Sequence, residues 1–506
     1  MSFLGWMIDL AREQAPRVDV LRDWLLRSAD AGYDAIGLYL EHRFEYASAP
    51  WAAAAGCLTP VMLRELRDTI GPRGPRVIPF LNALGHVEGF IRAEGGQWLA
   101  EGPAAGSLSR QLCPSRTECV RFSEGLIRDA LAAFDDEWVH LGGDETRQLG
   151  QCPRCAERVA SVGKAGLYAA HFAPLCQIVL DAGRRPCLWG DMLLAHPQAL
   201  DALPRQTLIF DWQYERRPRD STRVFRQRGF DVVCCPSLQT YNSGWCFLAE
   251  SQENFDQHLA DSAAEDALGV MLTTWEFSAF SQYDSVLPLV LAAARRARHG
   301  SSWEAAIEAA GGVAYANAAR ILGRLVPAAA RFIGPETWRQ LRDRLVMRQN
   351  PFALWRDWRD EAAGAAGDEV LKLCDEARRA ADAASLPTPE LAGLTFAIDL
   401  HRAAVSWVRQ VEIAARCYAD GQLKNCVSQL HAGRATLDSL RPGILAATQR
   451  GGAVADEARL DRLLTMVDEV IARIGTLRAS GFRPTFETLC AREYLPGDQA
   501  AWPTGS

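Results

Sequence analysis

The stretch Val139-His140-Leu141-Gly142-Gly143-Asp144-Glu145 decides the fold, because a short apolar strand runs into two glycines and two adjacent carboxylates. Two glycines let the backbone turn sharply without side-chain clashes, so the next two residues can project into a cavity at the carboxyl end of the strand. Acidic side chains placed there can protonate a group, stabilise charge or orient a substrate. A solvated loop or the first turn of a helix is the alternative that this stretch alone leaves open.

Short apolar, β-branched runs of this kind alternate with longer amphipathic segments through the first three hundred residues. This alternation is typical of a parallel sheet with helical crossovers. The predicted helices include Val20–Ala31, Pro60–Ile70 and Leu167–Ala182. Eight strands with crossovers favour a (β/α)8 TIM barrel over a doubly wound sheet, and we assign this α/β barrel to residues 1–300. The predicted strands are Gly5–Leu10, Ala35–Leu40, Val77–Leu81, Glu137–Leu141, Pro186–Trp189, Thr207–Asp211, Asp231–Cys235 and Gly269–Thr274.

Beyond about residue 300 the strand pattern disappears. Long segments rich in alanine, leucine and arginine follow, with apolar residues at helical spacing, as in Ala305–Leu325, Val370–Ala384 and Leu460–Ile474. We therefore expect residues 301–506 to form an all-α C-terminal domain.

Composition narrows the class of protein. With 506 residues, 48% of them hydrophobic, the chain can form about two to four domains with large cores. A net charge of −7 without a basic stripe argues against nucleic acid and against an anionic membrane surface as partners. No stretch approaches the roughly 20 apolar residues of a membrane helix, and Met1–Gly5 lacks the start of a secretory leader. We expect a cytoplasmic protein without membrane contact, and a homodimer is left open.

The fourteen cysteines do not suggest a disulfide framework, because many lie inside apolar runs such as Val232–Cys235. The exception is Cys152-Pro153-Arg154-Cys155, whose spacing suits a metal ion or a redox pair. No second Cys-x-x-Cys completes a set of four ligands. We therefore predict no metal site and no cofactor, and whether Cys152 and Cys155 bind metal stays open.

The residues that follow the predicted strands are rich in carboxylates and aromatic rings. A barrel gathers the carboxyl ends of its strands at one mouth, so these side chains form one candidate site. Flat aromatic walls with converging hydrogen-bonding groups suit a sugar, which predicts a glycan or small glycoside substrate. No glycine-rich loop follows a strand, which argues against a nucleotide. The candidate residues are Glu41, His86, Asp144, Glu145, Trp189, Asp191, Trp212, Tyr241, Trp275 and Glu276.

These residues resemble the family 20 glycoside hydrolases, the β-N-acetylhexosaminidases, and among them the compact hexosaminidase D type. The resemblance spans roughly residues 1 to 290. Its sharpest element is His140–Glu145, which is similar to the family's acid motif, and Val77–Leu81 with Gly85–Glu88 is similar to its strand-three segment. The pocket aromatics of the family are matched by Trp189-Gly190-Asp191, Trp212, Tyr241 and Trp275.

The resemblance implies an exo-acting, retaining β-N-acetylhexosaminidase in which the 2-acetamido oxygen of the substrate is the nucleophile. It implies that Glu145 is the general acid and that Asp144 accepts the acetamide N–H and stabilises the oxazolinium intermediate. Tyr241 would donate to the acetamide oxygen. Glu41 and His86 would form a relay that holds Glu145 protonated.

The resemblance also implies how the sugar is held. Trp189, Trp212 and Trp275 would enclose the acetyl methyl group and the face of the sugar. Asp191 would either accept hydrogen bonds from its hydroxyl groups or cap a neighbouring loop, and Glu276 is better placed to accept them.

Two departures from the larger family members leave the sugar open. The larger members have an arginine, which binds two sugar hydroxyls, at the position that Leu4 occupies before Gly5. They also have one residue between the tryptophan and the glutamate that are adjacent here as Trp275 and Glu276. N-acetylglucosamine and N-acetylgalactosamine are therefore both candidates. Two other functions remain open: a catalytically weak sugar-binding barrel, and a conventional retaining β-glycosidase that uses Glu145 and Glu276.

Overall fold

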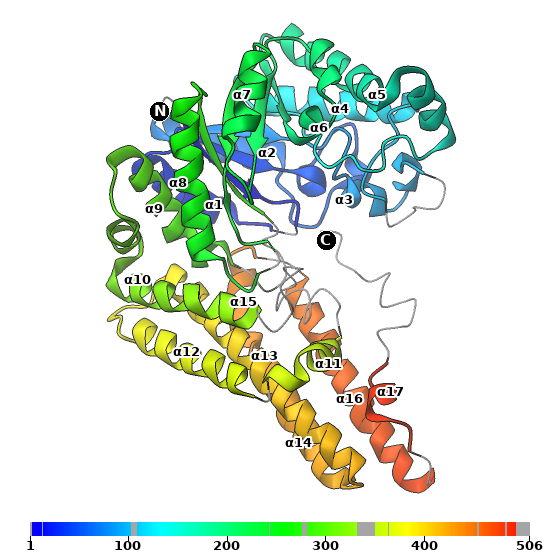
Figure 1. Ribbon diagram of the computed structural model, residues 1–506, viewed down its shortest axis with the longest axis vertical. Coiled ribbons are helices and arrows are strands. Elements are labelled where there is room, and N and C mark those ends of the chain that lie inside the picture. Colours follow the sequence, from blue (N-terminus) through cyan, green and yellow to red (C-terminus); the bar gives the residue numbers. More distant parts are fainter. Residues whose placement is uncertain are drawn as a thin grey trace.

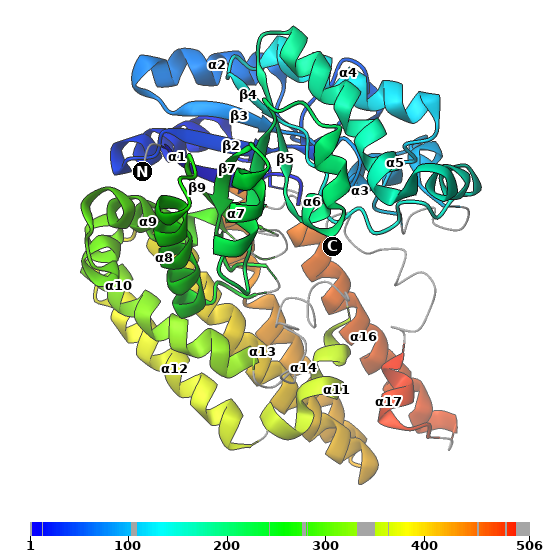
Figure 2. The same cartoon turned by 45° about the horizontal axis from the view of Figure 1, so that its top comes forward.

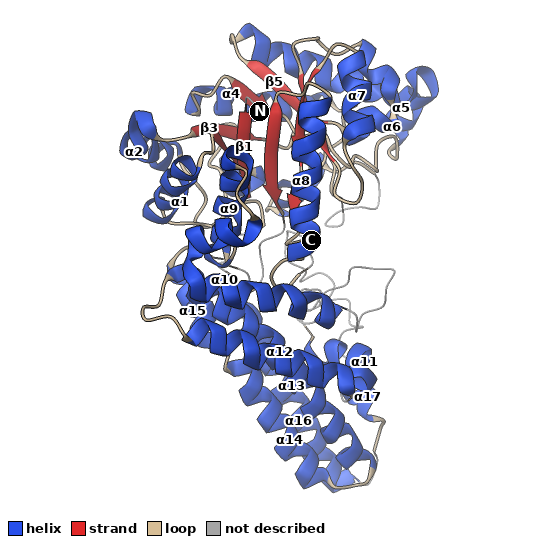
Figure 3. Cartoon of the chain, turned by 60° about the vertical axis from the view of Figure 1, so that its left-hand side comes forward, coloured by secondary structure: helices blue, strands red, loops and turns tan. Residues whose placement is uncertain are grey.

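The computed structural model describes residues 3–12, 14–102, 109–241, 243–275, 280, 282–330, 350–362, 364–452, 455–480 and 483–491. The chain forms two parts, a barrel and an array of helices below it (Figure 1). In Figure 3 the strands lie inside a ring of helices, whereas the lower part consists of helices.

Eight parallel strands form the barrel. Each strand pairs with the next in the chain, and β9 pairs with β1, which closes the sheet. The two-residue strand β8 (Ser237–Leu238) adds to the carboxyl end of β9. The prediction of a TIM barrel is therefore confirmed, and Figure 2 shows the sheet with helices around it. Every predicted strand lies within a few residues of its predicted place. The barrel strands are β1 (Phe3–Asp9), β2 (Ala35–Tyr39), β3 (Arg76–Phe80), β4 (Trp138–His140), β5 (Arg185–Trp189), β6 (Leu208–Trp212), β7 (Asp231–Cys235) and β9 (Gly269–Thr274).

Helices cover the outside of the barrel. The predicted ends of α1 and α2 are confirmed: Gly32 ends α1 with a φ of 114°, and the Thr59 hydroxyl caps α2 by accepting from the Met62 N–H at 3.1 Å. Helix α5 begins at Pro153 rather than at the predicted Leu167. The helices are α1 (Val18–Ala31), α2 (Pro60–Ile70), α3 (Glu88–Arg92), α4 (Thr117–Ala133), α5 (Pro153–Asp181), α6 (Asp191–Ala195), α7 (Arg219–Gln227), α8 (Leu248–Ala264) and α9 (Leu287–His299).

The interior of the barrel is a packed core of inward-facing side chains. Phe80 stacks on the His140 ring at a centroid distance of 4.4 Å, and Phe210 and Trp189 close around them. Gly37 makes room for this layer, because a Cβ atom there would lie 2.4 Å from the Phe80 ring. The filled interior leaves the mouth of the barrel as the place for a site.

The remaining described helices confirm the all-α part. The long helix α13 packs against α11, α12 and α14. The last barrel helix ends at His299 and α10 begins at Trp303, and that the two parts are separate domains stays a prediction. No helix in the described ranges is long and apolar enough to cross a membrane. The helices are α10 (Trp303–Ala330), α11 (Pro351–Ala362), α12 (Ala365–Asp382), α13 (Pro389–Ala419), α14 (Leu423–Asp438), α15 (Arg441–Gln449), α16 (Asp456–Ser480) and α17 (Phe486–Leu489).

The helical part holds two loops that leave the carboxyl end of the barrel. The Ala15 N–H, after β1, donates to the Gly451 carbonyl at 2.9 Å. After β9, the Phe280 N–H donates to the Asp456 carboxylate at 2.7 Å, and the buried carboxylate of Asp284 pairs with Arg450 at 3.0 Å. These contacts brace the loops next to the barrel mouth.

Candidate active site

A cavity of about 760 Å³ lies at the carboxyl ends of the strands. This volume lies in the range of small-molecule sites. The fold brings seven of the ten predicted site residues to its wall, among them Asp144, Glu145 and Tyr241. The cavity is lined by Arg12, His86, Asp144, Glu145, Arg147, Asp191, Leu194, Ala195, Trp212, Gln213, Tyr214, Glu215, Arg216, Tyr241 and Trp275.

Trp189 and Glu276 are not among these lining residues. Trp189 is completely buried in the barrel interior, 4.3 Å from the His140 ring and 5.8 Å from the Trp275 ring, measured between centroids. It therefore forms the layer beneath the cavity and supports Trp275, whereas we predicted direct contact with the sugar. Glu276 lies outside the described residues.

Three residues of this region have a positive φ that non-glycine residues seldom adopt: Glu41 (41°), His86 (52°) and Glu145 (47°). Such strained residues persist where the surroundings over-determine them, and they cluster at functional sites. The predicted sharp turn is present as well, since Gly142 and Gly143 have φ values of 79° and 97°. The backbone thus aims the two carboxylates at the cavity.

His86 lies among three carboxylates. Its Nε2 is 3.4 Å from Asp144 Oδ2 and 3.4 Å from Glu145 Oε2, and its Nδ1 is 3.5 Å from Glu88 Oε1. Burial disfavours the imidazolium, but the charges of Asp144 and its neighbours outweigh it and raise the pKa of His86 well above the ordinary value. Burial likewise opposes ionisation of Glu88, yet the adjacent His86 imidazole, whose Nδ1 lies 3.5 Å from Glu88 Oε1, lowers the pKa of Glu88 to about 2. His86 is therefore a buried cation at neutral pH.

The predicted relay between Glu41 and His86 needs correction. Glu41 Oε1 accepts a hydrogen bond from the Gly89 N–H, and its Oε2 lies 3.5 Å from His42 Nδ1. Glu41 therefore anchors the start of α3, and the carboxylate next to His86 Nδ1 is Glu88. The positive φ at His86 turns the chain so that Glu88, two residues later, faces the same imidazole ring.

Glu145 is ionised in this arrangement. The neighbouring His86 imidazole lowers the pKa of Glu145 to about 2, with a further contribution from the charge of Arg147 and against the effect of burial. Arg147 Nη2 lies 2.7 Å from Glu145 Oε1, but the Arg147 side chain is 81% exposed. An ion pair exposed to this degree is weak, so a substrate can displace it.

Asp144 and Asp191 have raised pKa values, in contrast to the lowered pKa of Glu145. Burial raises the pKa of Asp144, and burial together with the charge of Asp144 raises the pKa of Asp191 to about 7. Asp191 Oδ2 accepts the Glu145 N–H at 2.9 Å. Asp144 Oδ1 is buried without a hydrogen-bond partner in the described part of the chain. The site therefore holds an acceptor that a ligand N–H could satisfy.

Aromatic rings form one wall of the cavity, and Tyr214 joins those that were predicted. The Tyr214 ring lies 5.1 Å from Trp212 and 6.0 Å from Tyr241 between centroids, and its hydroxyl accepts the Trp275 indole N–H at 2.5 Å. Tyr214 follows Trp212 by two residues, and side chains two apart on an extended segment share a face. This spacing is the signal that could have identified it.

Arg12 is another lining residue that the sequence analysis missed. It follows β1, pairs with Asp9 at 3.3 Å, and its guanidinium carbon lies 5.3 Å from the Tyr39 ring centroid and 5.8 Å from that of Trp275. Its N–H groups are hydrogen-bond donors at the cavity wall. Arg12 therefore places a cation on the cavity wall, at the opposite end of β1 from Leu4.

The geometry can be compared with known proteins. Residues 50–276 match the model of the glycosyl hydrolase family 20 catalytic domain. This segment of the barrel is therefore similar to the catalytic domain of that family. The family 20 match includes the acid motif, the strand-five motif and every predicted aromatic of the site.

The chain is also similar to curated relatives and to a solved structure. A β-hexosaminidase of Akkermansia muciniphila is 28% identical over 237 residues, which are 42% of this chain and 46% of that protein. A β-hexosaminidase of Vibrio furnissii is 25% identical over 198 residues, 37% of this chain and 31% of that one. The matches therefore span less than half the length of these relatives. The fold resembles the chitobiase of Flavobacterium johnsoniae, with a TM-score of 0.51 and 16% identity over 85% of this chain and 74% of that chain.

The raised pKa of Asp191 leads to a prediction about stability. Because unfolded aspartate titrates near about 3.9, the native state keeps a proton that the unfolded chain releases, and stability falls as the pH rises toward about 7. We expect wild-type protein to lose about 2 kcal/mol more than Asp191→Asn between about pH 5 and pH 8. Urea unfolding of both proteins at the two pH values measures this difference.

Asp220→Asn, at an exposed carboxyl of α7, is the control and should behave as wild type. If the free energies of unfolding of wild type and Asp191→Asn differ by the same amount at both pH values, the raised pKa of Asp191 is contradicted.

Proposed function

We propose that this protein is an exo-acting, retaining β-N-acetylhexosaminidase that removes terminal N-acetylglucosamine or N-acetylgalactosamine by substrate-assisted catalysis. One observation carries the proposal: a family 20 barrel places the adjacent pair Asp144 and Glu145 on one cavity wall, together with Tyr241 and the tryptophans. The names of the curated relatives support the same activity.

Asp144 is proposed to orient the acetamide group. Its buried Oδ1 has no partner among the described residues and can accept the acetamide N–H. This hydrogen bond turns the acetamide oxygen toward the anomeric carbon. The carbon–oxygen bond that then forms replaces the glycosidic bond and leaves a positively charged oxazolinium ring. The negative charge of Asp144 stabilises that ring, and the effect is large because the site is buried.

Glu145 is proposed to protonate the glycosidic oxygen, with His86 as the source of the proton. A sugar that enters the cavity displaces water and the exposed Arg147 side chain, which removes one interaction that keeps Glu145 ionised. His86 Nε2, 3.4 Å away, can then transfer its proton to Glu145. In the second step Glu145 accepts a proton from the water that opens the oxazolinium ring, so the anomeric configuration is retained and the carboxyl is restored.

The other wall residues are proposed to hold the sugar. Tyr241 donates its hydroxyl to the acetamide oxygen, and Trp212 and Trp275 cover the apolar faces of the acetyl group and the ring. Trp189 supports Trp275 from below. Asp191 accepts hydrogen bonds from the sugar hydroxyl groups. Glu276, which directly follows Trp275 in the sequence, is proposed to do the same.

A panel of aryl β-glycosides tests this function. We expect 2-acetamido-2-deoxy glucosides or galactosides to be hydrolysed on the order of 10² times faster, or more, than the corresponding glucosides and galactosides, because only the former carry the internal nucleophile. The relative rates of the two 2-acetamido substrates give the gluco or galacto preference. Initial rates for all four substrates are measured at matched concentrations.

Two outcomes would replace the proposal. Comparable rates without the acetamido group, or a covalent adduct of a 2-fluoro sugar on Glu276, would support the conventional retaining glycosidase. Binding of N-acetylhexosamine without turnover of any substrate would support a sugar-binding barrel.

A further inference from the structure

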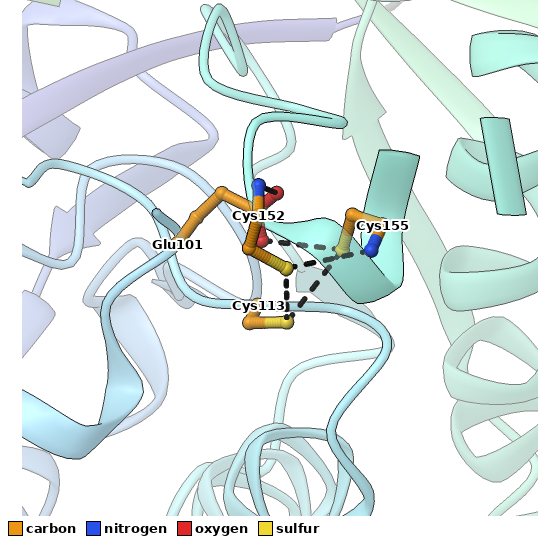
Figure 4. A group of neighbouring side chains, drawn as sticks. All are labelled: Glu101, Cys113, Cys152 and Cys155. Carbon is orange, nitrogen blue, oxygen red and sulfur yellow. Dashed lines mark hydrogen bonds between the residues drawn. The ribbon is translucent and has the colours of Figure 1, made fainter. Parts of the chain in front are cut away.

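A buried cluster of three cysteines and one glutamate lies outside the cavity (Figure 4). One potential ligand atom from each of Glu101, Cys113, Cys152 and Cys155 lies within 4.8 Å of all the others. Cys113 Sγ is 3.5 Å from the Sγ atoms of both Cys152 and Cys155, and Glu101 Oε2 is 3.2 Å from Cys155 Sγ. Figure 4 shows the four side chains pointing toward one another from three separate segments of the chain.

We propose that this cluster is a structural zinc site with three thiolate ligands and one carboxylate ligand. Zn–S bonds of about 2.3 Å in a tetrahedron place sulfur atoms about 3.8 Å apart. The sulfur separations of 3.5 Å for Cys113 lie within a few tenths of an ångström of that edge. Thiolates favour zinc over magnesium or calcium, and four protein ligands leave no position for a substrate.

The backbone orients these ligands before any ion binds. Cys152 is the N-cap of α5, and its Sγ accepts the N–H of Cys155 one turn later at 3.4 Å, so both sulfurs face the same side. Glu101 Oε1 accepts the Cys152 N–H at 3.1 Å, which directs Oε2 toward Cys155 Sγ. A helix start and a backbone hydrogen bond thus hold three of the four donors in place.

The charge of Glu101 also supports a cation. Glu101 is completely buried, and in the described part of the chain its carboxylate accepts hydrogen bonds from a backbone N–H and a thiol. A buried carboxylate is costly unless a cation or several donors balance it. A disulfide between two of the cysteines would leave the carboxylate and the third sulfur without such a partner. Zinc balances all four groups at once.

The proposed ion would join the two loops that carry the catalytic residues. The segment before Cys113 pairs with the loop of His86: the Leu112 N–H donates to the Leu84 carbonyl at 3.0 Å, and the Val87 N–H to the Arg110 carbonyl at 3.2 Å. Cys152 follows Glu145 in the β4–α5 loop. Zinc would therefore link the segments that position His86 and Glu145. This last consequence, unlike the zinc site, rests on the proposed function.

Metal analysis of the full-length protein tests the site. We expect protein purified without chelators to contain about one zinc ion per chain, measured by plasma mass spectrometry. Cys113→Ser and Cys155→Ser should each lose most of this zinc and unfold at a lower temperature. Cys119→Ser is the matched control, because Cys119 is a buried thiol of α4 that faces the Leu99 carbonyl at 3.6 Å and is not a member of the cluster. It should keep its zinc.

A second measurement remains informative if the serine variants do not fold. Replacement of zinc by cobalt in the wild-type protein should produce the visible absorption bands of tetrahedral Co²⁺ with thiolate ligands. Metal-free protein with a disulfide from Cys113 to Cys152 or Cys155 would overturn the proposal, as would iron in place of zinc or full zinc content in Cys113→Ser. Metal content is measured without an activity assay. A result that contradicts the zinc site is therefore distinct from a result that contradicts the proposed hydrolysis.

Discussion

Glu145→Gln is expected to lower kcat for 2-acetamido glycosides with poor leaving groups by a factor on the order of 10²–10⁴, the usual contribution of a general acid. Substrates with acidic phenol leaving groups should lose much less, because their departing oxygen needs little protonation. The measurement is kcat across a series of aryl glycosides of decreasing phenol pKa. A steeper dependence on the leaving group in the variant than in the wild type is the expected signature.

Two features make this experiment interpretable. Glutamine keeps the size of Glu145 and its hydrogen-bonding oxygen near Arg147, so the fold should be unchanged. Glu157→Gln, on an exposed position of α5, is the control and should retain full activity. Equal losses for good and poor leaving groups would remove Glu145 from the role of general acid.

Asp144→Asn is the second substitution with a large expected effect. If Asp144 stabilises the oxazolinium charge, kcat/KM should fall by a factor on the order of 10²–10³, as is common when a group that stabilises transition-state charge is removed. A thiazoline mimic of the oxazolinium should bind the wild-type enzyme much more tightly than the free sugar, and Asp144→Asn should weaken this inhibition in parallel. Inhibition constants and kcat/KM are measured on the same preparations.

Binding of the uncharged product is the control for this prediction. N-acetylhexosamine carries no positive charge, so its affinity should change much less than that of the charged mimic. A variant that loses activity while the inhibition constant of the thiazoline stays the same would show that Asp144 does not act on the positive charge. If Asp144→Asn no longer shows a cooperative thermal unfolding transition, Asp144 instead contributes to the packing of the fold.

The extent to which the sequence predicted this protein differs between the barrel and the site. The strands were predictable because each is a short apolar run bounded by turn residues, as in Val139–Gly143. The end of α1 and the start of α2 were predictable because Gly32 and Thr59 satisfy backbone groups locally. Helix α5 was predicted too short, since the segment before Leu167 is polar and contains Gly163, where the helix bends.

The candidate site was predictable where a residue lies at the carboxyl end of a strand or in the loop that follows it. Asp144, Asp191 and Trp212 reach the cavity because parallel strands present their carboxyl ends at one mouth. The partner of His86 could not be derived in this way. Glu41 and Glu88 both lie near it in sequence or strand order, and the positive φ of His86 decides that Glu88 faces the ring.

The sequence by itself determined the barrel, the helical part and the acid motif, because each depends on the periodicity or turn chemistry of a few neighbouring residues. The tertiary structure alone decided which distant side chains meet. Trp189 lies beneath the cavity and Arg12 on its wall because the packing of side chains from several strands in the closed barrel sets their depth. Cys113 joins Cys152 and Cys155 because two loops pack together although 39 residues separate Cys113 from Cys152. Such contacts depend on packing between elements, which no local pattern of residues encodes.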